Sequence, residues 1–263
     1  MGFKKQTRNL SDHPGLQVLL PHYSSYAVKG LAAFKSEKRR FHASALELYA
    51  AGVFERVSEL DNALAALRLT AGFVTELSSR PSPSPDIYRY HYENFVLRVI
   101  GFVDRAHRLV GAVLLLNRKE FEAPSGNQYV QQQVRLDDDK LTSALQAVAQ
   151  AVRSYKGPRN ELIHAAAFST PELGIFLSVQ QIGLDTGGID VDELARQHFA
   201  QGSEEIALTI ARLEALLTTL LDVLAPRFST AAAHEDGSRE TQTGVEGNQI
   251  VAGRKTQTTK DLQ

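Results

Sequence analysis

Apolar residues recur at steps of three and four along most of this chain, most regularly in its first long run. The run comprises Leu46, Ala50, Val53, Val57, Leu60, Leu64, Leu67, Ala71 and Val74. Alternating steps of four and three place these side chains in one seam along a helix, which indicates lengthwise packing against a partner helix. The pattern predicts a helix from Glu37 to Ser79, about 65 Å long at ~1.5 Å per residue. Gly52 and Asp61-Asn62 are the places where it could break.

A second run with the same steps lies beyond a proline-rich segment, Pro81 to Pro85. Alternating prolines lack backbone donors and hold their neighbours extended, so this segment ends the first helix. The second run comprises Phe95, Val99, Phe102, Ala106, Leu109, Val113 and Leu116. A flanking stripe of apolar residues, from Val96 to Val110, predicts that this helix is deeply buried on one side.

The next elements are marked by start and stop signals. Pro124 to Asn127 reads as a loop, and the acidic run Asp137 to Asp139 favours a helix N-terminus. Gly157 is expected to end that helix, with Pro158 opening the following one in the first position that proline prefers.

Two further helices are predicted before the chain becomes polar. Thr170-Pro171-Glu172 is a start signal, although the segment after it, Ile175 to Val179, also fits a short strand. Asp190 to Glu193 fits a capping box. Gly202 is expected to divide the last helical region, and Pro226 to end it.

These patterns predict an all-α protein, an antiparallel helical bundle. We expect a helical region over residues 1–85 that ends in the Pro/Ser linker, a bundle over 86–228, and a tail over 229–263. The tail is rich in Thr, Gly, Gln and Glu and has no periodic apolar residues, so it is expected to be disordered.

Composition limits the kinds of site and the cellular location that we expect for this protein. The sequence has no cysteine, which rules out disulfides and cysteine-based metal or redox sites. The first eight residues carry charge with no apolar stretch behind them, and no run approaches the ~18 apolar residues of a membrane span. We therefore expect a cytoplasmic protein without a membrane partner.

Charge gives no argument for a nucleic-acid partner. The net charge of the chain is −1, and outside the predicted tail the basic and acidic residues balance. Affinity for a polyanion would have to come from local clusters, such as Lys35 to Arg40 or the pair Arg105 and Arg108. Such runs are usually solvated helix faces, and we interpret both clusters in that way.

The segment most suggestive of chemistry is Arg159-Asn160-Glu161-Leu162-Ile163-His164. Asn160 and His164 are four apart, which places them on one face of a helix. At a helix start, unpaired backbone donors and a planar guanidinium favour a phosphate, and the positive helix end favours a neutral histidine. Together these groups could cleave RNA without a metal: a base takes the 2′-hydroxyl proton, an acid protonates the leaving oxygen, and a cation stabilises the phosphorane.

The same R-N-x-x-x-H pattern occurs a second time, from Arg8 to His13. There Pro14-Gly15 follows at once, and no apolar periodicity places the segment on a helix. We interpret this copy as accidental.

The later copy resembles the R-x4–6-H motif of the HEPN superfamily, in the form with Asn after Arg, and the resemblance covers roughly Asp86 to Phe228. It implies a small helical homodimer whose two motifs face one cleft. It also implies a metal-independent endoribonuclease of the toxin, defence or RNA-processing type, without a cofactor, in which Arg159, Asn160 and His164 are catalytic. RNA is then the substrate, with an antitoxin or regulatory protein as a further partner. Several toxin members carry Tyr two residues after the His, where this chain has Ala166, so regulation by modification of that Tyr is not expected.

Four other interpretations stand beside this one. Arg159 could pair with Glu161 or with another chain while His164 is an interior histidine. Some HEPN members are catalytically silent modules that bind a protein or nucleotide. A di-metal site from Glu161-x-x-His164 and Asp104-x-x-His107 is disfavoured because Asp104 falls opposite the apolar seam. The aromatic cluster Tyr88 to Tyr92 could stack on bases, but we expect it to begin a buried helix.

Overall fold

In the computed structural model of this protein, residues 9–38, 40–135, 138–164 and 170–238 are described. Every regular element in these ranges is a helix, which confirms the all-α bundle. The α-helices are α1 (Leu20–Lys35), α2 (Ala45–Ser78), α3 (Pro85–Val99), α4 (Gly101–Val113), α5 (Arg118–Phe121), α6 (Gly126–Arg135), α7 (Asp139–Ala151), α8 (Lys156–His164), α9 (Pro171–Ile182) and α10 (Val191–Ser238). Three 3₁₀ turns are η1 (Leu10–Asp12), η2 (Pro14–Leu16) and η3 (Arg153–Tyr155).

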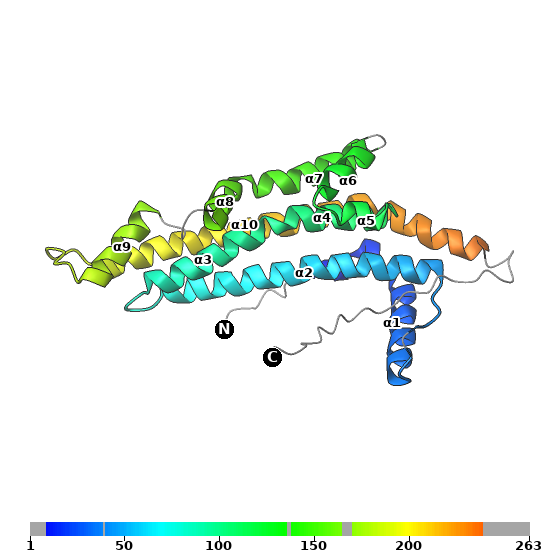
Figure 1. Cartoon of the computed structure of the whole chain (residues 1–263), viewed down its shortest axis with the longest axis horizontal. Coiled ribbons are helices and arrows are strands. Elements are labelled where there is room, and N and C mark those ends of the chain that lie inside the picture. The colour runs from blue at the N-terminus through cyan, green and yellow to red at the C-terminus, as the bar shows by residue number, and fades with distance from the viewer. Residues whose placement is uncertain (1–8, 39, 136–137, 165–169, 239–263) are drawn as a thin grey trace, which may run out of the picture.

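The two longest helices, α2 and α10, pack against each other along the long axis of the molecule (Figure 1). The predicted seam of α2 faces the core: eight of its members are buried, and Ala71 is partly buried. On α10 the buried residues Ile206, Ile210, Leu213, Leu217, Leu220 and Leu224 follow the same rhythm. The prediction of a lengthwise partner helix is confirmed, and α2 is unbroken at Gly52 and Asp61.

The first helix begins later than predicted, at Ala45 rather than Glu37. Ser44 and Glu47 form a capping box: the Ser44 Oγ accepts a hydrogen bond from the Glu47 N–H at 3.1 Å, and Glu47 Oε2 accepts one from the Ser44 N–H at 2.8 Å. Glu47 also accepts two hydrogen bonds from Lys29 Nζ, at 2.6 and 2.7 Å. The box fixes the start of α2, and the lysine ties α1 to it. In Figure 1, α1 projects away from one end of the bundle, beside the start of α2.

The second apolar run is divided into α3 and α4 at Ile100. Its seam is buried as expected, from Phe95 to Val113, while Leu116 lies beyond the end of α4. Of the tyrosines at its start, Tyr88 and Tyr92 are core residues, only 2% and 9% exposed, whereas Tyr90 is 62% exposed, so the cluster is buried only in part. Asp104 faces solvent, as the pattern predicted.

The stop and start signals between residues 124 and 158 are only partly confirmed. Asp138 caps α7 by accepting a hydrogen bond from the Leu141 N–H at 2.8 Å. Within the predicted loop, however, Gly126 begins α6. Gly157 does not end a helix either, because α7 ends at Ala151 and the turn η3 leads directly into α8. Gly157 and Pro158 thus lie in the first turn of α8, where a proline costs no hydrogen bond.

The last two helices also differ from prediction. Thr170 caps α9, which is a helix and not a strand. The helix α10 runs through Gly202 and Pro226 without a break. At Gly202 the absence of a side chain admits the Tyr88 hydroxyl, which approaches the place where a Cβ would lie. Past Pro226 the helix continues to Ser238, because Leu224 and Phe228 on either side are fully buried and hold both halves to the core.

Side chains from both predicted helical regions belong to one hydrophobic core, which includes residues from Leu10 to Phe228. The helical residues 229–238 were expected in the tail, and of that tail residues 239–263 lie outside the described part of the chain. No helix among the described residues combines the length and apolar character needed to cross a membrane.

Candidate functional site

The motif predicted from the sequence lies on the short helix α8, which packs against α3. Arg159 is half-buried, while Asn160 and His164 are exposed. The Arg159 Nη1 donates a hydrogen bond to Asn160 Oδ1 at 3.3 Å. His164 is the last residue of α8 and has no hydrogen bond or ion pair with another described residue. The alternative of an interior histidine is therefore wrong, and Arg159 forms no ion pair with Glu161. Pairing of Arg159 with another chain stays a prediction.

The expected phosphate site at the start of this helix is not formed. The turn η3 precedes α8 without a gap, and the Lys156 N–H donates to the Arg153 carbonyl. His164 lies at the opposite end of α8, as its last residue, and not at the start where the phosphate site was expected. The predicted helix start at Pro158 is two residues later than the observed start at Lys156, because proline suits any position in a first turn.

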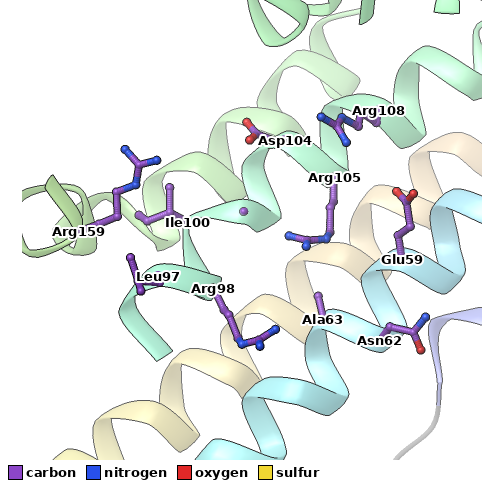
Figure 2. Close-up of a pocket in the computed structure, with 11 residues that line it drawn as sticks. Glu59, Asn62, Ala63, Leu97, Arg98, Ile100, Asp104, Arg105, Arg108 and Arg159 are labelled. Carbon is purple, nitrogen blue, oxygen red and sulfur yellow. The ribbon is translucent and has the colours of Figure 1, made fainter. Parts of the chain in front are cut away.

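A groove of about 650 Å³ lies between α2, α3, α4 and α8. Its lining residues are Glu59, Asn62, Ala63, Leu97, Arg98, Ile100, Gly101, Asp104, Arg105, Arg108 and Arg159. Figure 2 shows Arg159 at one end, beside Leu97 and Ile100, and Glu59 and Asn62 of α2 at the other. We call this hollow the arginine groove, since four helices bring four arginines and two carboxylates to it.

None of the four arginines forms an ion pair with a carboxylate within the described chain. Arg98 Nε donates to Asn94 Oδ1, and Arg159 to Asn160. Arg105 and Arg108 have neither an ion pair nor a hydrogen bond with a described side chain. By contrast Arg56, which is buried nearby on α2, binds Glu59 at 2.7 Å and Glu122 at 2.5 Å.

The two carboxylates at the groove are engaged elsewhere. Glu59 binds Arg56, and Asp104 Oδ1 accepts a hydrogen bond from Asn127 Nδ2 at 2.5 Å. The groove therefore holds more positive charge than its own acids neutralise. Planar guanidinium groups at close range are suited to phosphate or carboxylate oxygens.

Gly101 positions one of these arginines. The Arg105 Nη1 lies against Gly101, close to the point that a Cβ would occupy. Any larger residue at 101 would push the guanidinium away from the helix junction. The junction of α3 and α4 thus leaves space beside Gly101 for the Arg105 guanidinium group.

Of the three residues predicted to be catalytic, only Arg159 lines the groove. Asn160 and His164 do not line it. The arginines Arg98, Arg105 and Arg108 were not predicted as site residues, and the interpretation of Arg105 and Arg108 as a merely solvated face is incomplete. A signal was present: steps of seven and three place all three arginines on one face of the α3–α4 run.

His107, which was considered for a di-metal site, is hydrogen-bonded within the fold. His107 is fully buried, with Nδ1 2.7 Å from the Val103 carbonyl and Nε2 3.1 Å from Gln131 Nε2. Burial lowers the pKa of His107, although the Val103 carbonyl and the Asp104 charge oppose the shift. Within the described ranges no three potential metal ligands come together. Ala166 lies outside those ranges.

Compared with protein-family models, with curated proteins and with solved structures, the chain finds no match.

Proposed function

We propose that this protein binds RNA in the arginine groove and cleaves it as a metal-independent endoribonuclease of the HEPN type. The observation that carries the proposal is that Arg159 of the R-N-x-x-x-H motif lines the same groove as three other arginines, none of which pairs with a carboxylate among the described residues. A row of unpaired guanidinium groups is what a phosphodiester backbone requires. RNA is favoured over other anions because the motif supplies groups suited to attack by a 2′-hydroxyl.

In this proposal Arg159 binds the scissile phosphate and His164 transfers protons, with Asn160 orienting the arginine through their hydrogen bond. Cleavage needs both an acid and a base, whereas each motif has one histidine. A two-fold homodimer that brings two α8 helices together supplies the second histidine. The exposed position of His164 leaves it accessible to such a partner.

A second candidate function is a non-catalytic helical module that binds a nucleotide or an acidic protein in the same groove. The observation in its favour is that Asn160 and His164 do not line the groove, so binding there does not require them. The near-neutral charge of the chain also favours a small ligand over a long polyanion.

The test begins with binding of single-stranded RNA as a function of salt. The double variant Arg105→Gln/Arg108→Gln should weaken binding and reduce the slope of log K against log salt by ~0.7 for each lost phosphate contact. Arg212→Gln, an exposed arginine on α10 outside the groove, is the matched control and should leave the slope unchanged. Equal losses in both variants would overturn the proposed groove.

Cleavage is tested separately with the dimer, identified by sedimentation. It should persist in EDTA and leave 2′,3′-cyclic phosphate ends, because the 2′-oxygen is the nucleophile. Groove-dependent binding without any cleavage would favour the non-catalytic module. A strict monomer that cleaves RNA would overturn the two-motif mechanism.

A further inference from the structure

A second hollow lies next to the arginine groove, between α1 and α2. It is about 620 Å³ in volume and shares Glu59 and Asn62 with the groove. Its other wall includes Tyr23 and Tyr26 of α1, facing Leu48 and Gly52 of α2. Because Glu59 and Asn62 line both hollows, the two adjoin along α2, one extending to α8 and the other to α1.

The chemistry differs between the two hollows. In the second hollow the only arginine is Arg118, which binds Glu122 through Nε at 2.9 Å and lies 3.6 Å from Glu55. This end thus offers no unpaired guanidinium for a phosphate. It offers aromatic and apolar surface instead.

Both tyrosines are held in place from behind and remain half-buried. The Tyr23 ring stacks on Phe54 with centroids 4.5 Å apart, and the Tyr26 ring lies edge-on to Phe41 at 5.1 Å. Rings that are fixed by neighbours lose little freedom when a ligand packs against them, so they suit stacking of a planar base.

Gly52 leaves open space in the wall of the second hollow. It lies in the middle of α2, where glycine is less favourable than alanine, and no atom lies within 4 Å of the position that its Cβ would take. Packing within the chain therefore does not require a glycine here. A missing side chain opens the hollow to something that approaches the helix backbone.

We infer that single-stranded RNA occupies both hollows, with phosphates at the arginine groove and a base packed against the tyrosines of α1. The inference rests on the proposed function and names its substrate class. Leu48 and Ala63 are ~22 Å apart along the helix axis. A stacked strand with the ~3.4 Å spacing of duplex DNA would need about six nucleotides to cover this length. A mononucleotide cannot reach both ends, and a duplex hides its base faces within the stack.

The first experiment fills the second hollow. Gly52→Leu should weaken binding of a fluorescent eight-nucleotide single strand by ~10–100-fold, the effect of losing a stacked base, and leave the salt slope unchanged. Gly72→Leu is the matched control, because Gly72 lies on the same helix with equally open space around its Cβ position. It should bind like wild type. Both changes replace a helical glycine, so neither is expected to unfold the protein.

The second experiment removes the stacking surface. Tyr26→Leu, with its melting temperature checked, should weaken the eight-nucleotide strand similarly and leave binding of a dinucleotide unchanged, because the dinucleotide occupies only the arginine groove. Arg105→Gln should weaken both ligands. Wild type should bind the single strand more tightly than a blunt duplex of equal length.

The outcomes separate the inference from the proposed function. RNA binding that needs Arg105 but is unaffected by Gly52→Leu and Tyr26→Leu would overturn the second hollow and leave the arginine groove standing. Equal affinity for the duplex would also overturn the inference. Wild-type protein that binds no RNA would overturn both.

Discussion

The two R-N-x-x-x-H segments of this chain have opposite environments. In the N-terminal copy, His13 is 8% exposed and bonded on both ring nitrogens: its Nε2 is 3.1 Å from Asp222 Oδ1, and its Nδ1 accepts from the Gly15 N–H at 3.1 Å. In the later copy, His164 is exposed at the end of α8 and bonded to no described residue. The Arg8 of the first copy lies outside the described chain, whereas Arg159 of the second lines a groove.

The same sequence motif thus places its histidine in two different structural settings. His13 caps the turn η2 and connects it to α10, so its hydrogen-bonding capacity is used by the fold. The His164 side chain makes no hydrogen bond or ion pair with any residue that the structure describes. The N-terminal copy is therefore structural rather than merely accidental, a role that its spacing did not reveal.

The largest expected effect is on catalysis. His164→Ala should lower RNA cleavage by ~10²–10⁴-fold, the usual loss on removing a general acid or base, and Arg159→Ala should cost a comparable amount by removing phosphate stabilisation. His13→Ala should cleave at the wild-type rate per folded molecule. Initial rates on a labelled RNA, corrected for the folded fraction, measure this. Wild-type cleavage by both folded motif variants would remove the ribonuclease mechanism.

For the free energy of unfolding, we expect the opposite ranking of the two histidine variants, with the larger loss in His13→Ala. His13→Ala leaves the Gly15 N–H and Asp222 without their partner, and we expect a loss of about 1–3 kcal/mol in the free energy of unfolding. His164→Ala, an exposed residue without described contacts, should stay within ~0.5 kcal/mol of wild type. Urea unfolding of the two variants makes the comparison. A larger loss for His164→Ala would show that α8 docks in a way that the described contacts omit.

The dependence of stability on pH should distinguish His107→Leu from His164→Ala. Burial lowers the pKa of His107 below its ordinary 6.5, and burial also lowers the pKa values of His91 and His198. Between these lowered values and 6.5 the unfolded chain binds more protons, so the folded state should lose stability as pH falls through this range. His107→Leu should flatten the decline in urea stability from pH 7.5 to 5, whereas His164→Ala should retain it. An unchanged decline in His107→Leu would mean that other groups cause it.

The smallest expected effect concerns the partner of His13. The Asp222 side chain is 68% exposed, so its charge is screened by solvent. Asp222→Asn should lower the free energy of unfolding by less than ~1 kcal/mol, well below the loss in His13→Ala. Losses of equal size would indicate that the carboxylate, and not the bond to Gly15, makes His13 structural.

Some of this architecture is determined by the sequence locally. The seam from Leu46 to Val74 requires a helix with a lengthwise partner, because any other conformation would expose most of its apolar side chains. Caps at Asp138 and Thr170 are equally local, since a side-chain oxygen only needs to reach a backbone donor three residues on. The R-N-x-x-x-H pattern likewise identified Arg159, which lines the groove.

The tertiary structure decided which local signals were overruled and which residues meet. Gly202 and Pro226 would each interrupt an isolated helix, but contact with Tyr88 and burial of Phe228 keep α10 continuous. Arg159 joins the arginine groove only because α8 packs against α3, which places it in one lining with Arg105, more than fifty residues earlier in the chain. Helical periodicity fixes the face on which a side chain lies, but not which other helix that face will meet, because that depends on the packing of the whole bundle.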